Sequence, residues 1–141
     1  MATVIDNSAD AAATISWPGR ILSGIAVAFL LMDSGMKIAG LPQVTQSAAE
    51  MGWPTGTDYW RIMGLVLLAC TALYTWPRTA ALGAILLTGW LGGAIATHLR
   101  LGDPWFSHVL FGVYVGLFVW GGLWLRSPAL RALIPFTPAK D

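Results

Sequence analysis

Residues 79–97 read TAALGAILLTGWLGGAIAT, a run of nineteen residues without a charged side chain. An α-helix rises about 1.5 Å per residue, so about 20 residues cross the ~30 Å hydrocarbon core of a membrane. A strand of a membrane barrel would alternate polar and apolar residues, and this run does not alternate. An open strand would leave backbone groups unpaired in lipid, so the run predicts a transmembrane helix.

Three other runs have the same character, and together they predict four spans at about residues 21–39, 59–76, 79–97 and 104–125. The composition agrees, because 56% of the residues are hydrophobic and 11% are charged, against about 25% charged in soluble domains. A soluble domain of this size could not bury so much apolar surface. The sequence therefore predicts an all-α integral membrane protein, folded as an up-down bundle of four transmembrane helices.

The same pattern predicts the domain organisation. Residues 1–16 are expected to form a mobile tail, residues 17–126 the membrane domain, and residues 127–141 a short C-terminal tail. Asp6 and Asp10 stand where a secretory signal carries positive charge, so the first apolar run is interpreted as a retained anchor. Between the first two spans, Pro42 is expected to begin a short interfacial helix that ends near Met51.

Lysine and arginine placement predicts the orientation, because positive residues favour the cytoplasmic side. In an up-down topology, one side holds three basic residues and the other side, which includes both termini, holds five. Both termini are therefore expected in the cytoplasm. The two sets are Lys37, Arg61 and Arg100, and Arg20, Arg78, Arg126, Arg131 and Lys140.

Glycines four residues apart predict close helix packing. Gly89 and Gly93 form one such pair, and Gly112 and Gly116 form another. Where lipid supplies no hydrophobic drive, this spacing lets helix backbones approach closely. Two such pairs on consecutive spans favour packing within the chain over dimerisation. A homo-oligomer remains an alternative.

Charge and cysteine content exclude several classes of protein. The net charge is +1, so the sequence does not predict the strongly basic surface that binds nucleic acid. Cys70 is the only cysteine, so the chain can form neither an intrachain disulfide nor a CxxC pair. His98 and His108 could in principle bracket a haem or hold a divalent ion, but no HxxxH or HExxH motif is present. No metal site is therefore predicted.

The up-down topology brings seven ionisable residues to one end of the bundle, and we call them the polar cluster. In a structural interpretation they are ion pairs, a helix cap at Asp103 and side chains that reach the lipid headgroups. In a functional interpretation they line a pocket, where aspartate and histidine exchange protons and the basic residues hold an anionic or quinone-like head. Asp33 can pair with Lys37 one turn away, or with Arg61 or His98 across the bundle. The polar cluster is Asp33, Lys37, Arg61, His98, Arg100, Asp103 and His108.

Several short stretches between about Trp17 and Arg131 resemble the DoxX-like family of small bacterial four-span membrane proteins. The stretches are SGMK at 34–37, PRTA at 77–80, GAILLTG at 83–89, GGAIATHLR at 92–100, GDP at 102–104 and WGGL at 120–123. The resemblance implies a multi-pass protein of the bacterial cytoplasmic, or inner, membrane. Most relatives have no assigned activity, and some members of the wider family are linked to thiosulfate–quinone oxidoreduction or to membrane complexes that handle thiol and oxidative stress.

These observations favour a protein that is not an enzyme on its own. It would bind a small amphipathic molecule, a quinone or a lipid, and support a partner oxidoreductase in the membrane. One alternative is a stand-alone oxidoreductase or isomerase that uses Asp33 and His98 as proton donors or acceptors. A purely structural membrane subunit is another alternative. A small transporter ranks below these, because four spans without broken helices make a poor alternating-access machine.

Overall fold

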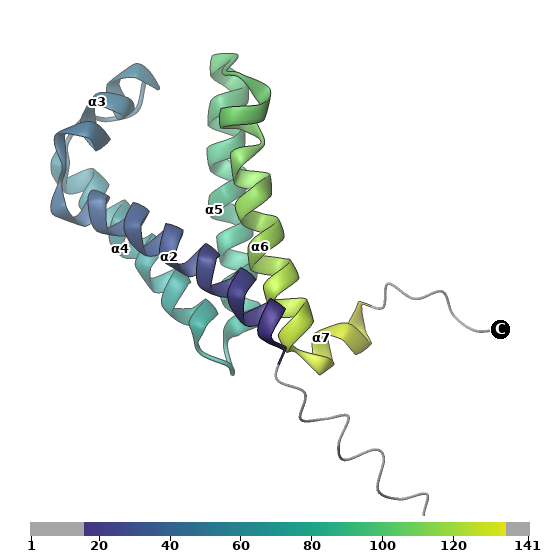
Figure 1. Ribbon diagram of the computed structural model, residues 1–141. Helices are drawn as coiled ribbons and strands as arrows, with labels where there is room; N and C mark the ends of the chain where they lie inside the picture. The colour runs from purple at the N-terminus through teal and green to yellow at the C-terminus, as the bar shows by residue number, and fades with distance from the viewer. Residues whose placement is uncertain (1–15, 135–141) are drawn as a thin grey trace, which may run out of the picture.

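The computed structural model describes residues 16–134, and every regular element in that range is a helix (Figure 1). Four long helices carry most of the chain, and three short ones connect or follow them. In chain order they are α2 (Trp17–Ala39), α3 (Pro42–Glu50), α4 (Thr57–Thr75), α5 (Ala80–Leu101), the π-helix η1 (Trp105–Val109), α6 (Phe111–Arg126) and α7 (Pro128–Leu133).

The ends of the long helices follow from local sequence. At the start of α2, the Ser16 hydroxyl accepts a hydrogen bond from the backbone N–H of Gly19, and Pro18 lies in the first turn. The helix stops at Gly40, whose φ of 68° is left-handed and therefore suits glycine. Gly102 ends α5 in the same way, with a φ of 72°. Pro42 then begins α3, as the sequence predicts.

The long helices pack in a ring in which α2 contacts α4, α4 contacts α5, α5 contacts α6, and α6 contacts α2. Figure 1 shows that this ring is not parallel-sided. The pair formed by α2 and α4 leans away from the pair formed by α5 and α6. The two pairs meet where α2 begins and α6 ends, and they diverge toward α3 and η1. The fold therefore has a closed end and an open end.

Small residues and one hydrogen-bonded tyrosine hold the closed end together. A Cβ at Gly122 would lie 2.7 Å from the backbone nitrogen of Ser23, so α6 and α2 approach to backbone contact there. The buried Tyr74 hydroxyl donates to the carbonyl of Val119 and accepts from the Ser23 hydroxyl, at 2.8 Å in both cases. One side chain of α4 thus ties together α2 and α6 at a site where lipid offers no alternative partners.

Within residues 16–134, three segments are long and apolar enough to span a membrane, namely Trp17–Ala39, Ala80–Leu101 and the combined Trp105–Arg126. These segments match the predicted spans at 21–39, 79–97 and 104–125 with shifts of a few residues at their ends. The predicted span at 59–76 corresponds to α4, which is not among the three. Asp58 and Arg61 in its first turns lower its hydropathy.

Large apolar side chains on the long helices face outward, as expected for surfaces in contact with lipid. They include Ile21, Ile25, Ile62, Leu65, Leu82, Ile85 and Leu117, each at least half exposed.

The predicted N-terminal tail lies outside the described residues except for Ser16. In the predicted C-terminal tail, residues 128–133 form α7, and residues 135–141 lie outside the described range.

The prediction that Asp103 caps the last span is wrong. The residue before η1 is Pro104, which makes no side-chain cap hydrogen bond. Asp103 follows the left-handed Gly102, and its backbone N–H donates to the carbonyl of His98. It therefore belongs to the end of α5, and its carboxylate turns back to the His98 ring.

Candidate functional site

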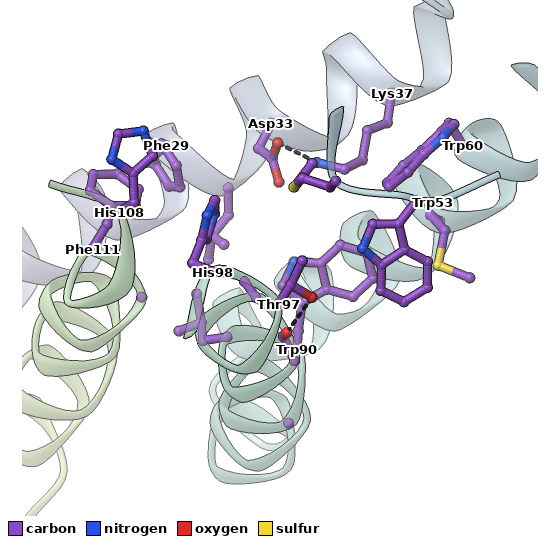
Figure 2. Close-up of a pocket in the computed structure, with 18 of the residues that line it drawn as sticks. Phe29, Asp33, Lys37, Trp53, Trp60, Trp90, Thr97, His98, His108 and Phe111 are labelled. Atoms are coloured by element: carbon purple, nitrogen blue, oxygen red, sulfur yellow. Dashed lines mark hydrogen bonds and ion pairs between the residues drawn. The ribbon is translucent and has the colours of Figure 1, made fainter. Parts of the chain in front are cut away.

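A cavity of about 470 Å³ lies at the open end, where the two helix pairs diverge (Figure 2). We call it the aromatic cavity because six aromatic side chains line it besides two histidines. These side chains are Phe29, Trp53, Tyr59, Trp60, Trp90 and Phe111. The remaining lining residues are Leu30, Asp33, Lys37, Met51, Met63, Gly89, Leu91, Gly93, Ala94, Thr97, His98, His108 and Gly112.

Asp33 and Lys37 supply the charged wall of the aromatic cavity from α2. They are one helical turn apart and form an ion pair. Lys37 is one of the three partners that the sequence predicts for Asp33. Their side chains are 24% and 13% exposed, so both charges are largely withdrawn from the surface. The Lys37 ammonium also lies 5.9 Å from the centre of the Trp90 ring, within the range of a cation–π interaction. Pairing and the aromatic face together lower the cost of placing this partly buried lysine within a membrane helix.

His98 lies across the cavity on α5, and Asp103 fixes the orientation of its ring. The Nδ1 atom of His98 is 2.6 Å from a carboxylate oxygen of Asp103. Because a carboxylate accepts, the neutral ring carries its proton on Nδ1, and Nε2 is then the acceptor. The His108 ring packs against His98 edge to face, with centroids 5.5 Å apart. The cavity therefore contains an imidazole of fixed orientation opposite an ion pair.

A loop and two aromatic contacts complete the walls. Arg100 donates to the carbonyl of Met51 at 2.5 Å, which fastens the loop after α3 to the end of α5. The Trp60 indole donates to the carbonyl of Pro54 at 2.7 Å, which fastens the same loop to α4. On the opposite side, the rings of Phe29 and Phe111 meet edge to face at 5.0 Å. Figure 2 shows Trp53 and Trp60 on one flank of the cavity, with Phe29 and Phe111 on the other.

The structure divides the polar cluster into two groups. Asp33, Lys37, His98 and His108 line the aromatic cavity. The other three do not, although Asp103 positions His98 and Arg100 anchors the loop. Arg61 pairs with Asp58 at 3.3 Å on an exposed face of α4, where such a pair contributes little.

Sequence reasoning missed the aromatic walls. Trp53 and Trp60 both line the cavity, and neither is among the candidate site residues predicted from the sequence. The predicted packing of Gly89 and Gly93 against another helix is also wrong, because an added Cβ at either position meets nothing within 4 Å. These two glycines line the cavity and keep it open beside Trp90. At Gly112 the prediction holds, since a Cβ there would lie 2.8 Å from the Ile95 side chain.

Other candidate chemistry lies away from the cavity. Within residues 16–134 no group of three or more histidine, cysteine or acidic side chains is placed to hold a metal ion. Cys70 is buried in α4 and does not line the aromatic cavity. Proton exchange and hydrogen bonding are thus the chemistry that the lining side chains offer.

Several apolar helices of membrane-spanning length, with outward-facing isoleucine and leucine, define a multi-pass helical membrane protein. The chain belongs to the DoxX-like family, whose sequence profile matches residues 21–122. That range includes every residue that lines the aromatic cavity. Comparisons with curated proteins and with solved structures gave no match.

Proposed function

We propose that the aromatic cavity binds a small amphipathic molecule with a flat polar head, of which a quinone is the best fit and a lipid headgroup the next. The observation that carries this proposal is the coexistence of a partly buried ion pair, Asp33–Lys37, and an oriented histidine, His98, within one aromatic-walled cavity. Ligand sites commonly combine mostly apolar walls with a few convergent polar groups.

Each part of a quinone has a matching part of the cavity. Trp90, Trp53 and Trp60 offer flat faces to a ring. The Lys37 ammonium can donate to a quinone carbonyl, while Asp33 and His98 Nε2 can accept from the hydroxyls of a quinol. The apolar tail would leave between the two helix pairs, which diverge at this end of the ring.

We assign the chain an accessory role in a membrane redox system. Reduction of a quinone to a quinol takes two electrons and two protons, and the lining side chains exchange protons only. The single cysteine cannot cycle between a dithiol and a disulfide. A partner oxidoreductase in the membrane would supply the electrons, and this chain would hold the quinone.

Binding of a short-tailed benzoquinone to the purified protein tests the proposal, with quenching of tryptophan fluorescence as the readout. The double substitution Asp33→Asn with Lys37→Met removes the ion pair without leaving a lone buried charge. It is expected to weaken binding about tenfold or more, the effect of losing a charge-assisted hydrogen bond. Arg61→Met is the matched control, because Arg61 lies in the polar cluster but not in the cavity. Equal affinity in all three proteins would reject the cavity as the site.

A stand-alone oxidoreductase or isomerase is the second candidate, favoured by the oriented His98–Asp103 pair. Turnover by the purified chain separates the two candidates. Bound quinone without turnover supports the accessory role. Turnover that Asp33→Asn abolishes and that Asp58→Asn leaves intact supports the enzyme, since Asp58 is exposed and lies outside the cavity.

We also propose that α4 is a fourth span and that both termini face the cytoplasm of a bacterium, across its inner membrane. The supports are the contacts of α4 with α2 and α5, and its lack of charge from Ile62 onward. A reporter that is active only in the cytoplasm is expected to be active when fused to either terminus. Activity at one terminus alone would mean an odd number of spans.

A further inference from the structure

A second cavity, of about 250 Å³, lies at the closed end of the helix ring. Two arginines on different helices line it, Arg20 from α2 and Arg126 from the end of α6. The other lining residues are Ser23, Gly24, Val27, Tyr74 and Thr75. We call it the arginine cavity. It shares no lining residue with the aromatic cavity, so the proposed function does not account for it.

The charge in the arginine cavity is not compensated by the chain around it. No carboxylate lines the cavity, and neither Arg20 nor Arg126 forms an ion pair with any residue in the range 16–134. The hydroxyl groups are already engaged as donors, with Ser23 bonded to Tyr74 and Thr75 to the carbonyl of Ala72. Two arginines from different helices therefore line one cavity, and no carboxylate is among the described residues that line it.

Arg126 is held in place, and its one buried donor atom without a partner among the described residues is Nε. One of its terminal nitrogens donates to the carbonyl of Tyr74 at 3.2 Å, and its guanidinium lies over the Tyr74 ring at 5.0 Å. Its Nε is buried and has no hydrogen-bond partner in the described part of the chain. A buried donor left without an acceptor is costly, so such a group calls for a ligand or solvent.

The surroundings are those of a membrane interface. Trp17 and Trp76 lie near the same end, are 65% and 64% exposed, and suit the headgroup region. The Arg20 guanidinium is 6.0 Å from the Trp17 ring centre, and its side chain is accessible. Gly24 and Val27 give the cavity an apolar side between helices. A ligand with an anionic head and an apolar body fits this combination.

We infer that the arginine cavity binds a phosphate group between Arg20 and Arg126. Guanidinium groups match phosphate in both charge and hydrogen-bond geometry, and a phosphate oxygen would satisfy the unused Nε of Arg126. The phosphate can belong to an anionic phospholipid or to a soluble phosphate, and the apolar side of the cavity favours the lipid. The site would fix a lipid where α2, α4 and α6 meet.

Lipid retention tests the inference. The full chain is placed in nanodiscs of mixed phosphatidylglycerol and phosphatidylcholine, released into detergent, and analysed by native mass spectrometry for retained lipid. Arg20→Gln and Arg126→Gln are each expected to reduce retained phosphatidylglycerol about tenfold, which is the loss of one charge-assisted contact. Arg78→Gln is the matched control, because it removes the same charge from the turn between α4 and α5, outside the cavity.

A second arm distinguishes the source of the phosphate. Delipidated protein is heated with millimolar inorganic phosphate or with phosphatidylglycerol, and the midpoint of thermal unfolding is compared. Protection by inorganic phosphate that depends on Arg20 supports a soluble ligand, whereas protection by the lipid alone supports the phospholipid. Because Arg126 also bonds to the Tyr74 carbonyl, Arg20→Gln is the decisive variant if Arg126→Gln fails to fold. Equal losses in Arg20→Gln and Arg78→Gln, or retention unchanged in Arg20→Gln, would overturn the inference.

Discussion

Replacing Gly83 by alanine is expected to destabilise the folded protein by about 3 kcal/mol, the upper part of the range for overpacking a tight contact. A Cβ at this position would lie 2.3 Å from the backbone nitrogen of Tyr74 and 2.5 Å from its Cα. Backbone atoms cannot move aside as a flexible side chain can. The start of α5 would have to separate from the end of α4. Tyr74 lies at that end of α4, and its buried hydroxyl makes the hydrogen bonds to α2 and α6, so these contacts would be disturbed as well.

Gly92→Ala is the matched control for this variant, because it makes the same substitution on the same helix. An added Cβ at Gly92 meets nothing within 4 Å. Alanine is the better helix former by about 1 kcal/mol, so this variant is expected to be as stable as the wild type or slightly more stable. Unfolding in detergent, followed by circular dichroism, measures both. Similar stability in the two variants would mean that α4 and α5 do not pack as closely as the structure has them.

The sequence predicts the helices well because their signals are local. The uncharged run at 79–97 and the proline at 42 act within one or two turns, and the structure agrees with each. Of the ionisable residues that the topology predicts at one end, Asp33, Lys37, His98 and His108 line one cavity. Helix reversal alone brings them together.

The shape of the site could not be predicted, because it depends on how far the helix pairs diverge. In a parallel-sided bundle, Gly89 and Gly93 would pack against a neighbouring helix, as their spacing indicates. Since the pairs lean apart, these glycines line a cavity, and Trp53 and Trp60 line it too. Asp103 fails as a cap for a related reason. The first turn after Pro104 is a π-helix, and the histidine one turn back in α5 takes its carboxylate.

The divergence of the helix pairs leads to the second large prediction, which concerns ligand binding. Gly93→Leu is expected to reduce binding of a short-tailed benzoquinone at least tenfold, about 1.4 kcal/mol or more. Gly93 lines the aromatic cavity, and an added Cβ there meets open space, so the leucine side chain would enter the volume proposed for the ligand ring. The fold should tolerate the change, because leucine favours a helix more than glycine does, by somewhat under 1 kcal/mol.

Gly92→Leu separates occupation of the cavity from any general effect of a larger residue on α5. Gly92 is the neighbouring residue, is equally open around its Cα, and does not line the cavity. Quenching of tryptophan fluorescence by the quinone should therefore be normal in Gly92→Leu and weak in Gly93→Leu, with both variants unfolding at the wild-type temperature or above. If Gly93→Leu binds as the wild type does, the quinone does not occupy the space beside Trp90. If both variants lose binding together, the effect arises from α5 as a whole and not from filling of the cavity.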